Sequence, residues 1–266
     1  MPGLPDPELQ PYGSLYGSKE AVHPSAGACF ICEGRYLVRE ALASGRDGKL
    51  NVLSVLSSQA QAEDWRALLP SGTRLLVAEA SFLEELLGFQ FHRGVLCCVQ
   101  QPPPPDEARL LGADCLLVLP RLDNVDNLGQ LLRTAAALGV DAIAVGRGPG
   151  PFERRTVRVS MGAAWRIPVS VGQDLPGLLA RWRAWDPSRP AEVVGAALVP
   201  GALPAHLWHP APRTALVLGP EDRGLDADWL AACDRHVVIP MANAMDSLNV
   251  AAAGAILMFR MTASGA

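Results

Sequence analysis

The chain has 266 residues, of which 49% are hydrophobic and 19% charged, and its formal net charge at pH 7 is −4. This composition is typical of a compact globular protein and argues against global disorder, while the acidic balance argues against a strong non-specific nucleic-acid binder. No apolar run reaches the ~20 residues needed to span a bilayer. No signal peptide is visible at the N-terminus, so we expect a cytoplasmic protein.

The N-terminal part of the chain predicts a small α/β domain behind a flexible tail. Residues 1–25 are rich in Pro, Gly and Ser, which is typical of a poorly ordered tail. Residues 26–100 alternate short apolar runs with helical patterns. We expect a strand or turn entering a helix within residues 31–45, strands at 50–56, 74–80 and 94–100, and a helix at 81–89.

The segment QPPPPDEA, residues 101–108, marks the clearest domain boundary. Four consecutive prolines are incompatible with a helix or a central strand and favour a stiff extended segment. Beyond it, residues 109–266 alternate strands with helices, which predicts a parallel, doubly wound sheet. The expected strands are residues 115–120, 141–146, 191–198, 214–219 and 236–240, with a helix at 127–139. Ligands of such sheets bind where loops leave the carboxyl ends of strands.

Six cysteines occur, and Cys29 and Cys32 have the C-x2-C spacing of some zinc or redox sites. The other close pair, Cys97 and Cys98, is adjacent in an apolar run, so in a strand its side chains would face opposite ways. We therefore favour reduced cysteines packed as small apolar residues and expect no metal.

The segment 122–140 (LDNVDNLGQLLRTAAALGV) combines a helix entrance with a basic residue. Asn127 and Gly129 stand at the entrance, where an asparagine can cap the helix. Arg133 lies among Leu and Ala residues, where an unpaired guanidinium would be costly. Arg133 therefore needs an acidic partner or a ligand anion, and the alternative interpretation is a surface ion pair.

Two later segments place polar residues after apolar strands. In LVLGPEDRGL, residues 216–225, Gly219 permits close backbone approach to a ligand. Glu221 or Arg223 could hold a ribose hydroxyl or a neighbouring loop, although a charged surface turn is an equal alternative. In residues 237–260, Ser247 and Asn249 can cap a helix or face a ligand. The run 250–258 that follows is apolar enough to predict a helix buried nearly all round.

A cluster of arginines occupies residues 154–169 (RRTVRVSMGAAWRIPV). It predicts a phosphate-contacting patch, with a solvated helix face as the alternative. The RNA-contact candidates are Arg154, Arg155, Arg158 and Arg166. The glycine-containing segment 144–150 (AVGRGPG) lacks the G-x-G-x-x-G pattern, which argues against a nucleotide-dependent oxidoreductase.

The motifs N-x-G-x-x-x-R-T-A, L-G-x-E-x-x-G and I-P-M…S-L-N-V, in this order, resemble those of the SpoU (TrmH-like) RNA 2′-O-ribose methyltransferases of the SPOUT class. The match covers about residues 112–262. It implies a parallel α/β sheet with a C-terminal trefoil knot, a feature that periodicity does not predict. FICEGRYLVREAL and HRGVLCCV also resemble the family's L30e-like substrate-binding domain, which we place at residues 26–100.

The resemblance implies that S-adenosylmethionine binds within the knot and that two copies form a homodimer with the active site near the interface. The implied cofactor-binding positions are Leu218, Gly219, Ile239, Met241 and Leu248. The implied catalytic positions are Asn127, Arg133, Glu221, Ser247 and Asn249. The implied partner is ribosomal or transfer RNA.

Methyl transfer to a ribose 2′-hydroxyl requires that the hydroxyl lose its proton or that its developing charge be stabilised. A guanidinium, protonated up to a pKa above ~12, is a reluctant base. We therefore expect Arg133 to orient the hydroxyl and stabilise its charge, and Ser247 and Asn249 to position the ribose or Arg133. The alternative function is a catalytically silent RNA-binding or ribosome-assembly protein of the same fold.

Overall fold

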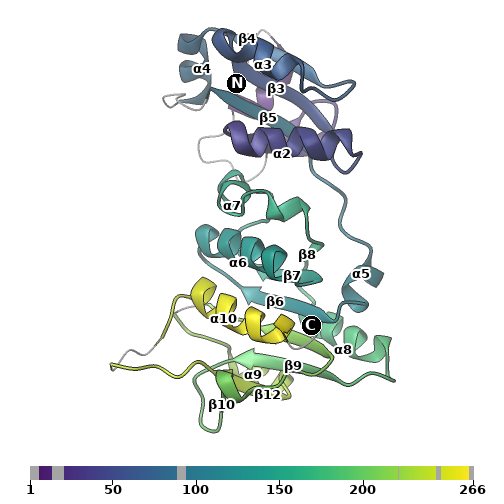
Figure 1. Cartoon of the computed structure of the whole chain (residues 1–266), viewed down its shortest axis with the longest axis vertical. Coiled ribbons are helices and arrows are strands. Elements are labelled where there is room, and N and C mark those ends of the chain that lie inside the picture. The colour runs from purple at the N-terminus through teal and green to yellow at the C-terminus, as the bar shows by residue number, and fades with distance from the viewer. Residues whose placement is uncertain (1–5, 14–20, 89–93, 221, 244–246, 264–266) are drawn as a thin grey trace. The chain divides into compact units, whose positions relative to one another are not determined.

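The computed structural model describes residues 6–13, 21–88, 94–220, 222–243 and 247–263. The chain divides into two compact units, drawn in Figure 1. Unit 1 contains residues 1–103 and 150–162, and unit 2 contains residues 104–149 and 163–266. The break after Pro103 lies within the proline run, whereas the grouping of residues 150–162 with unit 1 is a feature that the sequence did not indicate.

Unit 1 is built on a five-stranded sheet in the order β1-β2-β5-β3-β4. The β3–β4 pair is parallel and the other pairs are antiparallel. Its strands are β1 (Ala21–His23), β2 (Gly27–Glu33), β3 (Val52–Ser58), β4 (Arg74–Ala78) and β5 (Val95–Gln100). Its helices are α1 (Gln10–Gly13), α2 (Arg35–Arg46), α3 (Ala62–Arg66), α4 (Ala80–Leu87) and α7 (Arg154–Val159), with short 3-10 turns at Pro7–Leu9 and Gln59–Gln61.

The expectation of a flexible tail is wrong for the described residues between 6 and 23. Tyr12 is fully buried, and its hydroxyl donates to the Ser54 carbonyl at 3.0 Å and accepts from the Cys98 amide at 3.0 Å. The β3–β5 register shifts between Val52 and Ser54, next to Cys98. The aromatic ring thus packs into the core, while its hydroxyl accepts the hydrogen bond of the Cys98 amide at the irregularity in the β3–β5 pairing.

Replacing Tyr12 with phenylalanine should destabilise unit 1 by about 1–3 kcal/mol, because the Cys98 amide would be buried without an acceptor. Hydrogen exchange of the full chain, followed in peptides that cover β5, should show faster exchange at Cys98. Tyr36→Phe is the matched control, since the Tyr36 side chain is 51% exposed. Equal exchange in both variants would contradict the assigned role of the Tyr12 hydroxyl.

Unit 2 contains a seven-stranded sheet in the order β10-β12-β9-β11-β6-β7-β8, and every pair is parallel. This confirms the expected parallel α/β sheet. The strands are β6 (Cys115–Arg121), β7 (Ala142–Arg147), β8 (Val169–Val171), β9 (Ala191–Ala196), β10 (Leu203–Pro204), β11 (Arg213–Val217) and β12 (Arg235–Val238). The helices are α5 (Glu107–Leu111), α6 (Val125–Leu138), α8 (Leu175–Trp185), α9 (Ala227–Ala232) and α10 (Val250–Ala263), with 3-10 turns at Ala163–Trp165 and Ala205–Leu207.

Helices cover both faces of this sheet. Leu and Trp side chains of α5, α8 and α9 pack with β6, β7, β9 and β11 in one core, while α6 and α10 pack against each other (Figure 1). Their close approach depends on Gly254, where a Cβ would lie 2.4 Å from Leu131 Cδ2 and 3.0 Å from Leu218 Cδ1. The implied knot and the L30e-like resemblance of unit 1 stay predictions.

Helix α10 is not buried all round, which corrects the expectation from its apolar sequence. Val250, Leu257 and Met258 are buried, but Ile256 is 42% exposed and Phe259 59% exposed. Ala252 is exposed as well, so these three residues form one stripe at helical spacing. No helix among the described residues is long and apolar enough to cross a bilayer.

Candidate functional site

Asn127 and Asn249 meet although they are 122 residues apart in sequence. The Asn249 side-chain amide donates to Asn127 Oδ1 at 3.0 Å, and Asn249 Oδ1 accepts from the Ala251 amide at 2.9 Å. Asn249 therefore caps α10, as the sequence predicts, and also ties α10 to α6. Asn127 is 97% buried and is not the cap of α6, because Asn124 holds that position with an acceptor 2.8 Å from the Asp126 amide.

Beside this junction lies a cavity of about 350 Å³ at the carboxyl edge of the sheet. Three of the predicted cofactor positions line it, namely Leu218, Gly219 and Leu248, together with Ser247 of the predicted catalytic set. The volume is within the range of small-molecule sites. The lining is mainly apolar with several backbone groups, which fits a nucleoside held by apolar contacts and main-chain hydrogen bonds.

The backbone at Gly219 comes very close to the chain a few residues later. A Cβ on Gly219 would lie 2.5 Å from the carbonyl carbon of Gly224 and 2.8 Å from the Leu225 nitrogen. Only glycine permits this approach, because the atoms in question belong to the backbone and cannot turn aside. The glycine of the second motif thus shapes the cavity wall.

The structure corrects the environment expected for Arg133. Its side chain is exposed, so it does not need a buried partner. It lies on α6, six residues after Asn127. An exposed guanidinium on the helix that holds Asn127 is available to an anionic ligand or to a second molecule.

The arginine cluster does not form one patch within a single unit. Arg154, Arg155 and Arg158 belong to unit 1, whereas Arg166 belongs to unit 2. Arg154 donates to the buried Glu33 carboxylate at 2.7 and 3.1 Å, and an Arg158 nitrogen lies 3.8 Å from the same oxygen. Arg154 thus balances a buried charge, and RNA contact by the other members stays a prediction.

The remaining predicted site residues either do not line this cavity or are not among the residues that the structure describes. Ile239 and Met241 are half-buried but do not line the cavity, and Glu221 lies outside the described residues. Cys29 and Cys32 are buried in β2. Among the described parts of the chain, no cluster of three or more His, Cys, Asp or Glu residues could hold a metal ion.

One wall of the cavity was not predicted from the sequence. Residues 196–199, at the end of β9 and in the loop after it, line it together with Leu218 and Leu248. The available signal was the apolar strand at residues 191–198, because the loop after any parallel strand reaches the ligand edge of the sheet. This loop carries no polar motif and was not singled out.

Comparison with known proteins agrees with this arrangement. The model of the SpoU rRNA Methylase family matches residues 114–259. An uncharacterised tRNA/rRNA methyltransferase of Mycobacterium bovis is 34% identical over 98% of this chain and 90% of its own. The 23S rRNA (guanosine-2′-O-)-methyltransferase RlmB of Acinetobacter baylyi is 33% identical over 71% of this chain and 78% of its own. The crystal structure of an AdoMet-bound rRNA methyltransferase from Sinorhizobium meliloti matches with a TM-score of 0.77 at 25% identity, covering 98% of this chain and 96% of that one.

Proposed function

This chain belongs to the SpoU rRNA methylase family, and from that premise we propose that it methylates a ribose 2′-hydroxyl of ribosomal RNA with S-adenosylmethionine as the methyl donor. The observation that carries the proposal is the Asn249–Asn127 hydrogen bond. It joins the first and third motifs beside a cavity that Leu218, Gly219 and Leu248 line.

The cavity residues fit the cofactor by their chemistry. Leu218 and Leu248 provide apolar surface for an adenine ring, and Gly219 leaves its backbone open to the cavity. Bound there, S-adenosylmethionine supplies a methyl group on a sulfonium, a good leaving group. Transfer of that methyl group to a 2′-oxygen would release the neutral thioether, and the hydroxyl proton would pass to solvent water.

The protein's part is to orient the hydroxyl and to stabilise the charge that develops on its oxygen. Arg133 suits this role, because a guanidinium stays protonated at neutral pH and offers a planar fork of donors. Ser247 lines the cavity mouth and can position the ribose. The hydrogen bond between Asn127 and Asn249 fixes the beginning of α6 next to the beginning of α10. It thereby holds Arg133, on α6, at a fixed position relative to the cavity.

The test is methyl transfer from labelled S-adenosylmethionine to unmodified ribosomal RNA transcripts and, separately, to unmodified transfer RNA transcripts. Nucleoside digestion and mass spectrometry should show a 2′-O-methylnucleoside with the ribosomal RNA. The same product from transfer RNA alone would overturn the choice of substrate. Cofactor binding without any product from either RNA would favour the catalytically silent RNA-binding alternative.

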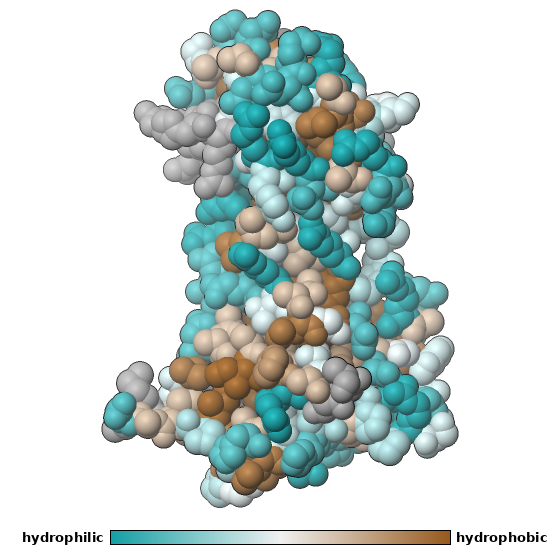
Figure 2. All heavy atoms as spheres, viewed as in Figure 1, coloured by the Kyte–Doolittle hydropathy of each residue, from teal (hydrophilic) through white to brown (hydrophobic). Residues whose placement is uncertain are grey.

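We further propose a homodimer in which the exposed stripe of α10 faces a second copy. Ile256 and Phe259 of this stripe are 42% and 59% exposed, Leu248 just before α10 is 38% exposed, and Figure 2 shows apolar surface in this region. Leu248 also lines the cavity, so the stripe continues directly from the proposed cofactor site. A second copy would therefore cover apolar surface and lie beside the reacting groups.

Phe259→Asp should convert the dimer into a monomer and lower methyl transfer, because burying an unpaired carboxylate in an interface is costly. Size-exclusion chromatography with light scattering measures the mass directly. Trp185→Asp is the matched control, since Trp185 is 52% exposed on α8, on the other side of the sheet. A Phe259→Asp protein that keeps the wild-type dimer mass would contradict this interface.

A further inference from the structure

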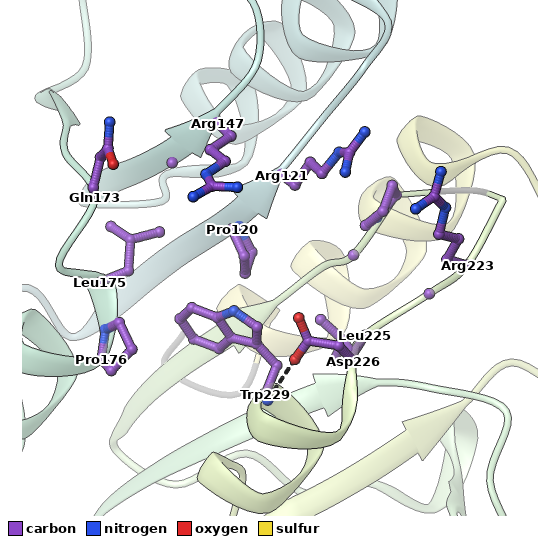
Figure 3. A pocket seen from close by; sticks show the side chains of 14 residues that line it. Pro120, Arg121, Arg147, Gln173, Leu175, Pro176, Arg223, Leu225, Asp226 and Trp229 are labelled. Carbon is purple, nitrogen blue, oxygen red and sulfur yellow. Dashed lines mark hydrogen bonds between the residues drawn. The ribbon is translucent and has the colours of Figure 1, made fainter.

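A second and larger cavity, of about 480 Å³, lies in unit 2 at the carboxyl ends of β6, β7 and β11 (Figure 3). Gly219, Pro220 and Arg223 line both this cavity and the proposed cofactor cavity, so the second motif separates the two. We call this second cavity the arginine pocket.

The position of the arginine pocket in the sheet is one that favours ligand binding. From β6 the chain proceeds to β7 and β8 on one side of the sheet and then crosses to β9 and β11 on the other. The helices change face with it, because α6 packs against α10 while α8 packs in the opposite core. Ligands of open α/β sheets bind in the crevice at such a reversal of strand order.

The side chains that line the arginine pocket carry more positive than negative charge. Arg121, Arg147 and Arg223 line it, against one carboxylate, that of Asp226. Arg121 pairs with Asp123 at 3.0 Å and Arg223 with Asp222 at 2.9 Å. Both pairs are exposed and worth little, so a phosphate can replace the carboxylates.

Arg147 is the cation of the three that is best suited to a ligand. It continues β7 beside Arg121 of β6, its register partner. Its side chain is exposed, and within the described part of the chain no carboxylate pairs with it. Guanidinium groups bind phosphate through two parallel hydrogen bonds, and Arg147 has its donors available for such a contact.

The opposite wall of the arginine pocket is aromatic and apolar. Figure 3 shows the Trp229 indole extending toward Leu175 and Pro176, below Pro120 and Arg147. The Trp229 backbone amide donates to the Asp226 carboxylate at 3.0 Å, which caps α9, and the indole packs against the core of unit 2. An indole that is half-buried and held in place in this way offers a face for a planar base.

We propose that the arginine pocket binds a nucleotide of the substrate RNA next to the nucleotide that is methylated, with its base on Trp229 and its phosphate on Arg147 and Arg121. This inference rests on the proposed function for the identity of the RNA. The shared wall formed by Gly219, Pro220 and Arg223 means that an RNA strand held in the pocket passes beside the cofactor cavity. The pocket would then position the strand and contribute to the choice of site.

The first experiment measures the affinity of the full-length protein for ribosomal RNA transcripts at several salt concentrations. Arg147→Ala should weaken binding, and the slope of log K against log[salt] should fall by about one, because one phosphate contact is lost. Arg109→Ala is the matched control, since Arg109 is an exposed arginine on α5 that lines neither cavity. In steady state, Arg147→Ala should raise KM for RNA and leave the affinity for S-adenosylmethionine unchanged.

The second experiment tests the base contact by tryptophan fluorescence with a short single-stranded oligoribonucleotide as the probe. The oligonucleotide should quench the wild-type emission, and Trp229→Phe should lose most of that quenching. Quenching by free AMP with none by the oligonucleotide would make the pocket a mononucleotide site and overturn the proposal. Equal salt slopes for Arg147→Ala and Arg109→Ala would overturn it as well.

These outcomes are distinguishable from failure of the proposed function. If the protein makes no methylated nucleoside but Arg147→Ala lowers the slope of log K against log[salt] by about one, the arginine pocket is supported and only the proposed enzymatic activity is contradicted. A protein that methylates RNA with unchanged KM after Arg147→Ala keeps the enzymatic assignment and loses the pocket.

Discussion

Replacing Arg133 with lysine is expected to lower kcat for methyl transfer by about 10²–10³-fold, the usual loss when one donor to a developing oxyanion is removed. One ammonium cannot reproduce the planar fork of a guanidinium. Because Arg133 is exposed, the substitution should leave the free energy of unfolding nearly unchanged. The loss would therefore report on chemistry and not on folding.

The measurement is steady-state methyl transfer together with S-adenosylmethionine affinity by calorimetry. We expect the affinity to stay at the wild-type level while kcat falls. Arg109→Lys serves as the control for the same chemical change at an exposed arginine away from both cavities. Near wild-type turnover in Arg133→Lys would show that any positive charge suffices and would remove Arg133 from the catalytic set.

Replacing Gly219 with alanine is expected to weaken S-adenosylmethionine binding by at least about tenfold, which corresponds to ~1.4 kcal/mol. The new Cβ would lie 2.5 Å from the Gly224 carbonyl carbon and 2.6 Å from its oxygen. Neither atom can move without shifting the loop, and this loop lines the proposed cofactor cavity. Calorimetric titration with the cofactor measures the effect.

Gly172→Ala is the matched control in the same unit. A Cβ on Gly172 would have no atom within 4 Å, and Gly172 has no positive φ. Circular dichroism should show that both variants remain folded. Wild-type cofactor affinity in a folded Gly219→Ala protein would place the cofactor outside the cavity bounded by Gly219.

The local chemistry of the site could be predicted from the sequence. The period of the apolar residues indicated the parallel strands, because such strands are buried on both faces, and the amide of Asn249 indicated a helix cap. The proline run indicated the break between the units. In each of these three cases the residues that indicate the strand, the cap or the break lie within a few positions of it, so local backbone geometry is enough to predict it.

The environment of Arg133 and the outer stripe of α10 could not be predicted in this way. A Leu- and Ala-rich helix shows that one face is apolar, but not whether the opposite face meets another element. The expectation that Arg133 sits in apolar surroundings and needs a partner failed for this reason, as did that of an α10 buried nearly all round. The prediction of a poorly ordered N-terminal tail failed in the opposite sense, because Tyr12 is buried. A Pro- and Gly-rich composition does not reveal that a distant pair of strands leaves a backbone amide without a partner, which the Tyr12 hydroxyl then supplies.

By itself the sequence determined the alternation of the longer strands with helices, the three motifs and the family to which they belong, since these depend on residue identity and local spacing; the short strands β8 and β10 were not predicted. Only the tertiary structure decided that Asn249 bonds to Asn127, that residues 150–162 belong to unit 1, and that Arg147 and Trp229 share a cavity. These relations join residues far apart in the chain. They depend on how strands cross over and which faces pack, which periodicity of three or four residues does not encode.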